Sequence, residues 1–435
     1  MKPLMKIAGW SAAGFIGLVI VCVVVIKSIS DDQYKKWVID AASSATGRQL
    51  AFDGDFNIHL GKDITLKAKD IRLANAEKGT RPDMITVDRL LLKVALLPIL
   101  RGVLDFVVEI DSPDILLETN ADGRGNWVFA DPTLEEAEPE QKNQEPAGSF
   151  ALPLKPYIRN FEITNLQFAF HDKVASDKHI SADIDTLKIF VDGNEIPLTL
   201  KAAYNGAPIE LSGILGRIDD LHANRITDTS LDGKLNEANL TIAGTIGPLA
   251  PKLNANLDLL LKADTVSTFS PFAGISLPDL QELDISLTAH ATEGKFAAED
   301  IKILVNDDSL HLNVAGNIGD LSEGAGIRLT TEINSENLDT ILDQMGIKPL
   351  SGLPASLSIE GVATGSLKVL ALDSLNVVVK DEGLAMNITG KATNLLAPAG
   401  VDVNITATID TVARISKFAG TEIPDLGALD LKGQI

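Results

Sequence analysis

The sequence predicts a mostly β protein that begins with a transmembrane helix and continues as an elongated, curved antiparallel β-sheet with a groove-like face and a few short helices. Three observations predict this class. A charge-free apolar run occupies residues 7–26, many later segments alternate apolar with polar residues, and aromatic residues make up only 5% of a chain that is 45% hydrophobic. Alternation with a period of two is typical of half-buried strands, so aliphatic side chains supply most of the buried surface.

The N-terminal run from Ile7 to Ile26 lies between Lys6 and Lys27 and contains no charged residue. A helix of about 20 apolar residues spans a hydrocarbon core of about 30 Å. A cleaved signal peptide has a shorter apolar core and a cleavage site between small residues, and this run shows neither. We therefore expect residues 1–30 to form a single-pass anchor that is not cleaved. The flanking lysines do not decide its orientation.

Composition and motifs exclude several function classes. The net charge of −22 argues against nucleic-acid binding and against wide adhesion to an anionic membrane surface. The single cysteine, Cys22, lies inside the apolar run, so the rest of the chain has neither disulfides nor thiolate ligands. Zinc-protease, P-loop and nucleophile-elbow motifs are absent from the sequence. We therefore expect no enzyme activity and no cofactor.

One histidine pair is a candidate for a metal site. His171 and His179 are eight residues apart, and Asp172 and Asp177 are their acidic neighbours. A metal site needs three or four converging ligands, so a polar loop is the preferred interpretation. We expect no bound metal.

Residues 31–130 predict an α+β region. A helix is expected over Asp31–Ala45, with Asp31 or Asp32 as its cap and Gly47 at its end. Further elements follow in order: a hairpin over residues 56–68, strands at 90–94 and 104–110, and between them a turn of helix at 95–100, which contains Pro98.

Residues 131–150 are acidic, contain proline and glycine, and have almost no apolar side chains. Such a segment does not bury enough surface to offset its ordering entropy, so it predicts a disordered linker. Residues 151–435 read as a repetitive β-sheet region. A segment with Phe-Ala-Gly and Pro-Asp-Leu at residues 270–283 returns at 417–429, with a looser copy at 342–353. Each copy predicts a short helix, a turn and a strand, and the third stops as its strand begins, so we interpret the region as truncated or as a short family member.

The strands of this region place aliphatic residues at alternate positions, which predicts one apolar face. That face either lines an open groove or meets another layer in a closed core. The candidate residues for the apolar groove are Leu257, Leu259, Ile285, Leu287, Leu312, Val314, Val377 and Val403.

Several segments resemble the beginning of AsmA-family proteins, and the later repeat is similar to the repeats of that family. The matching segments are Ala45–Arg48 (ATGR), Asp53–Asp55 (DGD), Asp70–Asn75 (DIRLAN), Val87–Pro98 (VDRLLLKVALLP) and Leu116–Trp127, which contains DGRGNW. The resemblance implies an anchor in the inner membrane of a Gram-negative envelope and a body in the periplasm. It also implies a curved sheet with an apolar concave face, like that of bridge-type lipid-transfer proteins, and no catalytic residues.

Two functions follow from the alternating strands and this resemblance. The first is phospholipid handling along the apolar groove in support of outer-membrane assembly, with phospholipid and the inner membrane as partners. The alternative is a non-enzymatic scaffold for outer-membrane proteins that acts through exposed strand edges. Outer-membrane assembly proteins are the expected partners of such a scaffold.

The anchor generates the first prediction. The mature protein should retain residues 1–30, because the run is too long for a cleaved signal peptide. Intact-mass measurement and N-terminal sequencing of the mature protein check this expectation. A mature chain that begins after Ser28 would show that the run is a signal peptide.

Overall fold

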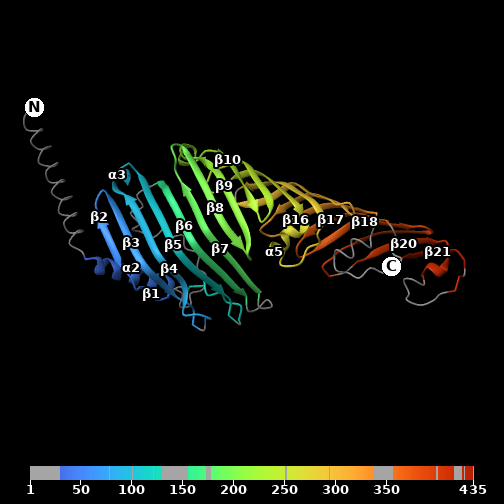
Figure 1. The fold of residues 1–435 in the computed structure, drawn as a ribbon, viewed down its shortest axis with the longest axis horizontal. Helices are drawn as coiled ribbons and strands as arrows, with labels where there is room; N and C mark the ends of the chain where they lie inside the picture. Colours follow the sequence, from blue (N-terminus) through green and yellow to red (C-terminus); the bar gives the residue numbers. More distant parts are fainter. Residues whose placement is uncertain are drawn as a thin grey trace, which may run out of the picture. The chain divides into compact units, whose positions relative to one another are not determined.

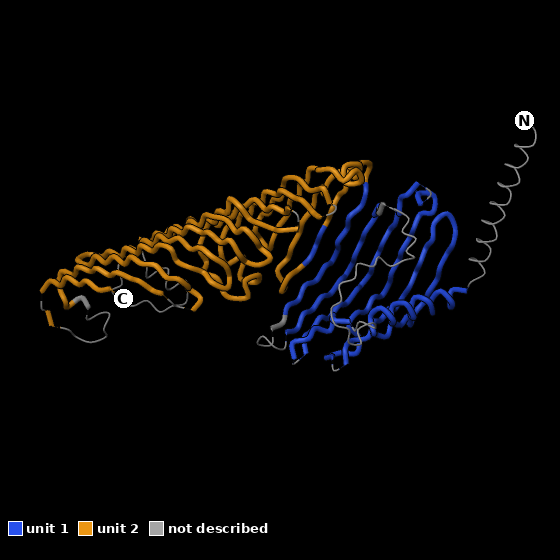
Figure 2. The backbone as a smooth tube through the Cα atoms, turned by 180° about the vertical axis from the view of Figure 1, so that it is seen from behind, with its two compact units in different colours: residues 1–191, 200–202 blue, residues 192–199, 203–435 orange. Residues whose placement is uncertain are grey.

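The computed structural model describes residues 30–434, apart from residues 78, 100, 121, 130–154, 173–177, 250–251, 293, 337–355, 398–399, 416–423 and 426. The predicted anchor and the acidic segment lie outside the described residues. Within the described part, no helix has the length and hydropathy that crossing a membrane requires. The chain forms two compact units, residues 1–191 with 200–202 and residues 192–199 with 203–435 (Figure 2).

The first unit is a β-sheet with two described helices. Its elements in order are α2 (Asp31–Thr46), β1 (Leu50–Phe52), β2 (Phe56–Leu60), β3 (Asp63–Ala74), β4 (Asp83–Ala95), α3 (Leu96–Ile99), β5 (Val103–Glu118), β6 (Lys155–Asp172) and β7 (Lys178–Phe190) (Figure 1). The expected helix, hairpin, strands and turn of helix are therefore confirmed within a few residues.

Strand pairing in this unit departs from the predicted antiparallel sheet at one place. β3 pairs with β1, β2 and β4, β4 with β5, and β6 with β7, all antiparallel. β5 and β6 instead pair in parallel. The chain between them, residues 119–154, is long enough for the crossover that a parallel pair requires. Both strands that flank the acidic segment belong to this one unit.

Helix α2 covers the apolar face at the beginning of the first sheet. Phe52, Phe56 and Ala68 form a buried cluster, against which Tyr34 and Ile39 of α2 pack. The predicted cap was wrong: Ser30 caps the helix by accepting a hydrogen bond from the backbone amide of Gln33. The predicted end is confirmed, since Gly47 stops the helix in the left-handed conformation, with φ at 64°.

Side chains of α2 also form hydrogen bonds with backbone groups at the outer edge of the sheet. The carboxylate of Asp31 accepts a hydrogen bond from the amide of Ile58 in β2 at 3.2 Å. The ammonium group of Lys35 donates to the carbonyl of Phe52 in β1 at 2.7 Å. Unpaired edge groups are a template for another strand, so these two contacts protect the edge.

The second unit consists of consecutive antiparallel strands joined mostly by short turns. Its elements are β8 (Glu195–Tyr204, which both units share), β9 (Ala207–Arg217), α4 (Ile218–His222), β10 (Thr227–Leu235), β11 (Ala238–Ile246), β12 (Ala255–Thr265), η1 (Val266–Phe269), α5 (Ser270–Ala273), β13 (Gln281–Thr292), β14 (Lys295–Asn306), β15 (His311–Asp320), β16 (Ala325–Ser335), β17 (Ser356–Ser366), β18 (Leu370–Asp381), β19 (Leu384–Ala392), β20 (Asp402–Ile409), η2 (Val412–Ile415) and β21 (Leu429–Gln434).

From β9 to β21 each strand pairs with the next. The described pairings do not join β21 back to β9, so this ladder is open rather than a closed barrel. The first copy of the sequence repeat has the predicted form, because η1 and α5 precede the turn and β13 follows it. The looser copy and most of the third lie outside the described residues.

Asp307 ties two turns of the second unit together. Its carboxylate accepts hydrogen bonds from the backbone amide of Gln281 at 2.9 Å and from the amide and hydroxyl of Ser309 at 2.8 and 2.5 Å. Burial alone would raise the pKa of Asp307. The hydrogen bonds from Ser309 and Gln281, together with nearby His311, hold that pKa below its ordinary value of 3.8.

This carboxylate generates a stability prediction. Because the folded-state pKa is lowered, Asp307 stabilises the fold above its unfolded-state pKa, and this stabilisation is lost as the pH falls through the folded value. Asp307→Asn should reduce the free energy of unfolding at neutral pH by about 1–2 kcal/mol. Urea unfolding at neutral pH and at progressively lower pH measures this. The difference between the variant and the wild type should shrink below pH 3.8, and a difference that does not change with pH would contradict the assignment.

Candidate functional site

An unbroken row of aliphatic side chains crosses eight strands of the second unit. Residues paired across antiparallel strands project to the same face, so the register defines this row directly. From β13 to β20 its members are Leu283, Val305, Leu312, Ile333, Ile359, Val377, Ile388 and Ile405. We call the face that carries this row the apolar face.

All eight residues that the sequence analysis proposed for a groove lie on the apolar face. Leu312 and Val377 belong to the row itself, and Leu259 pairs with Leu287. The other proposed residues join this face through strand pairs: Leu257 with Ala289, Ile285 with Ile303 and then Val314, and Val403 with Gly390 and then Leu375. Each of the eight is half-buried. Their role as lipid contacts stays a prediction.

One end of the apolar face is covered. Ala263, Leu283 and Val305 belong to a buried cluster near η1 and α5, and Val266 and Phe269 of η1 pack against it. Ile285 and Leu312 also pack against this cluster, whereas Leu257 and Val377 are not part of it. In the described part of the chain, no large side chain is fully buried. The face is therefore the surface of a single layer that is covered at one end, and not half of a closed sandwich core.

The opposite face of the same strands is polar. Asp258 accepts a hydrogen bond from the hydroxyl of Thr288 at 2.8 Å, and Lys262 lies 3.3 Å from Asp284 in an ion pair. Glu332 pairs in register with Glu360. This face suits contact with water, so the two faces of the layer differ as the alternation predicts.

Two glycines on the apolar face mark close approaches between strands. Gly316 has φ at +155°, and a Cβ there would lie 2.0 Å from the carbonyl oxygen of Arg328. Gly244 has φ at +147°, and its Cβ would lie 2.1 Å from the carbonyl oxygen of Asn256. A side chain does not fit at either position, and glycine within a strand permits the local bend that brings the backbones together.

The first unit repeats the same arrangement over six strands. Its apolar row begins under α2 and continues across strands that α2 does not cover. From β2 to β7 the row consists of Ile58, Leu66, Leu92, Val108, Phe161 and Ile189. All six side chains are half-buried.

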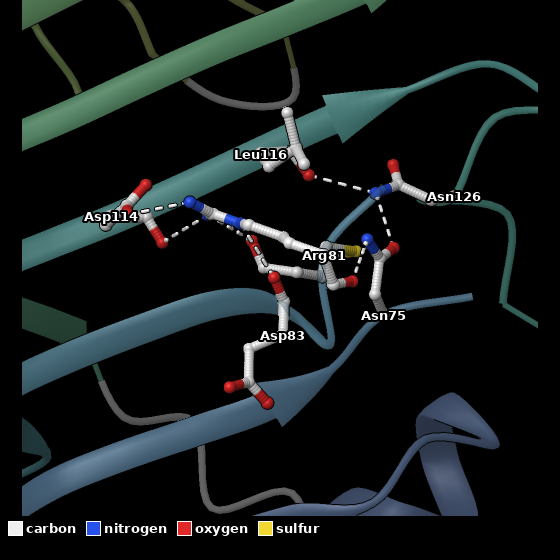
Figure 3. A network of polar contacts seen from close by, with 7 residues as sticks. Asn75, Arg81, Asp83, Asp114, Leu116 and Asn126 are labelled. Carbon is white, nitrogen blue, oxygen red and sulfur yellow. Dashed lines mark hydrogen bonds and ion pairs between the residues drawn. The ribbon is translucent and has the colours of Figure 1, made fainter. Parts of the chain in front are cut away.

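A polar network closes the strand ends of the first unit (Figure 3). Asn126 donates to the side-chain oxygen of Asn75 and to the carbonyl of Leu116, each at 2.9 Å. Asn75 in turn donates to Glu118 at 2.9 Å. Arg48 donates to the carbonyls of Asn75 and Asn126 at 3.0 and 3.2 Å.

The network unites segments that are far apart in the sequence, namely the ATGR, DIRLAN and DGRGNW motifs. A second cation lies beside it, since Arg81 pairs with Asp114 at 2.7 Å and donates to the carbonyl of Asp83 at 2.8 Å (Figure 3). A polar cavity of about 530 Å³ adjoins Arg48, Glu118 and Asn126. In the sequence, DGRGNW stands out only as part of the family resemblance, and no local signal indicates that Asn126 contacts Asn75.

The described residues offer no acid–base or metal constellation. His171 stands directly opposite His179 in the β6–β7 register, but no group of three or more potential metal ligands is found among the described residues. Where the pKa of a described carboxyl group is shifted, it is lowered, as in Asp111, where the hydroxyl of Thr164 donates to the carboxylate. A general acid at neutral pH would instead need a raised pKa.

The comparisons with known proteins identify the family. The family model for the AsmA family matches residues 1–348. The chain belongs to the AsmA family. No curated protein and no solved structure matches this chain. The resemblance carried by ATGR, DIRLAN and DGRGNW is confirmed, and in this AsmA-family chain those motifs hold the strand ends of the first unit in place.

The open part of the apolar face generates a stability prediction. An Asp at Leu257 or Val377 should lower the free energy of unfolding by only about 1 kcal/mol, because a half-buried carboxylate outside the covered cluster reaches water. Leu283→Asp should cost several kcal/mol, because it buries an unpaired charge among Ala263 and Val305. Urea unfolding of the three variants measures the contrast. Equal, large losses would show that the whole face is a closed core.

Proposed function

We propose that this AsmA-family protein handles phospholipid along the apolar face, with acyl chains on the aliphatic row and head groups in water. The observation that carries the proposal is the row of eight paired aliphatic residues on a single layer in which no described large side chain is fully buried. We place the protein in the inner membrane of a Gram-negative cell, with its body in the periplasm and a role in outer-membrane assembly. This placement is supported by family membership and by the apolar run of residues 7–26.

The length of the row suits acyl chains. Eight strands spaced by about 4.8 Å give seven intervals, or about 34 Å. Leu283 and Val305 are buried near η1, so the six members from Leu312 to Ile405 remain, and they cover five intervals, or about 24 Å. A bilayer core that holds two opposed acyl chains is about 30 Å thick, so this part of the row is longer than one extended chain. Each CH₂ group removed from water contributes about 0.8 kcal/mol. The row therefore binds acyl chains without a specific polar contact, and the binding does not select one head group.

The alternative function, a scaffold that pairs with client strands, requires an accessible strand edge. In the first unit, Asp31 and Lys35 occupy hydrogen-bonding groups on the outer edge of β2 and β1. These contacts disfavour strand addition at that edge. They argue against a scaffold that acts through this edge of the first unit.

Photocross-linking in cells tests the proposed function on the full chain. A photoreactive amino acid at Leu259 or Val377 should capture phospholipid, detected by mass spectrometry of the purified protein. The matched controls are Asp258 and Asn376, the sequence neighbours that project from the polar face. Capture should be confined to the apolar-face positions. Equal capture at all four positions, or none at any, would contradict the proposal.

A further inference from the structure

Among the described residues of the second unit, a set of exposed apolar side chains lies at one end of the strands. This end carries the turns β13–β14, β15–β16 and β17–β18 and the connection after β19. We define the loop rim as Phe296, residues 321–324, residues 367–369 and residues 394–396. Its most exposed large apolar residues are Phe296 at 43%, Leu321 at 47%, Leu367 at 71%, Val369 at 54% and Leu396 at 57%.

The opposite end of the strands differs. There η1 precedes α5, and Ile275, which follows α5, is 64% exposed. The buried cluster around Leu280 and Leu310 also lies at that end.

Backbone hydrogen bonds join neighbouring turns of the loop rim into one line. The amide of Leu321 donates a hydrogen bond to the carbonyl of Phe296 at 2.8 Å. The amide of Leu367 donates a hydrogen bond to the carbonyl of Gly324, also at 2.8 Å. The amide of Leu395 donates to the carbonyl of Leu370 at 2.7 Å. Successive turns are two strands apart, so the apolar tips recur about every 10 Å along this line.

The charge of the loop rim also differs from that of the chain. Among the described residues in and next to the loop rim, Lys295 and Lys368 are exposed, and the acids are the exposed Glu323 and the half-buried Asp320. The chain as a whole carries a net charge of −22. The overall charge opposes broad adhesion to anionic lipid, whereas on this line the two lysines offset the two acids and lie directly beside the apolar tips.

We propose that the loop rim docks on the surface of a phospholipid bilayer. The apolar side chains enter the boundary between head groups and acyl chains, and Lys295 and Lys368 contact lipid phosphates. Single side chains at separate polar turns insert among lipids, whereas a protein partner is anchored by a contiguous packed patch. Phe296 pairs with Ala291 on the apolar face. The loop rim therefore borders the end of the apolar face that η1 and α5 do not cover, and the bilayer would meet the face at that end. The docking does not depend on the proposed function, because it rests on the rim residues alone.

Site-specific fluorescence on the full chain tests the docking. In a Cys22→Ser background, Leu367→Cys, Leu396→Cys or Ile275→Cys is labelled with an environment-sensitive dye. The protein is reconstituted into vesicles of phosphatidylethanolamine and phosphatidylglycerol that contain a lipid-borne quencher. We expect blue-shifted, lipid-quenched emission at positions 367 and 396. The equally exposed control at position 275 should remain in water and be quenched by iodide.

Two further variants separate the contribution of the apolar side chains from that of the lysines. Leu321→Glu with Val369→Glu should reduce lipid contact of the label at position 396 by roughly tenfold or more, since apolar burial drives insertion. Lys295→Glu with Lys368→Glu should reduce it only when phosphatidylglycerol is present. A label at 367 that behaves like the one at 275 overturns the proposal. A label at 367 that is shielded from iodide but not quenched by lipid also overturns it, because a protein or a second copy then covers the rim. Photocross-linking at Leu259 is unaffected by either failure.

Discussion

Strand register is the constraint on which the rest of this structure depends. A one-residue slip of β15 against β16 would replace Leu312 by His311 or Asn313 on the apolar face and break the row. The polar face opposes such slips as well: a slip of β12 against β13 would separate Lys262 from Asp284 and turn one of them toward the aliphatic side chains. Each face thus specifies the register that the other requires. Short turns such as those between β15 and β16 and between β17 and β18 then carry this register from one strand to the next.

A single layer with an apolar face would aggregate if the face and its edges were fully exposed, since large apolar patches are uncommon on soluble surfaces. The structure limits this exposure locally. Helix α2 covers the beginning of the first sheet and occupies its edge groups through Asp31 and Lys35. In the second unit, η1 packs on the cluster around Leu283. What remains open is the stretch that contains Leu257, Val377 and their half-buried neighbours.

The period-two alternation predicted the apolar face and its eight candidate residues, because the direction of a strand side chain depends only on its position along the strand. The helix at Asp31, the turn of helix at Pro98 and the hairpin at Phe56 also have local signals. The parallel β5–β6 pair has none, because it depends on how a long connection returns to the sheet. The contact between Asn75 and Asn126 and the alignment of Phe296 with Leu321 are equally non-local. Alternation alone also left open whether the face was a groove or a core, and the absence of fully buried large side chains among the described residues favours an open layer.

The open layer separates stability from binding in an unusual way. In a two-layer protein the residues that bury apolar surface also hold the fold together, so a ligand-contacting residue in the core is hard to change. Here the backbone ladders and the cross-strand pairs supply much of the stability of a strand. The side chains of Leu257 and Val377 lie beside those of the neighbouring strands, and each remains half-buried. The covered cluster at Leu283 and Val305 holds the fold, while the open part of the row is available to an apolar ligand. This division explains how a chain with 5% aromatic residues and no fully buried large side chain in its described part forms a defined sheet and still presents a continuous aliphatic surface.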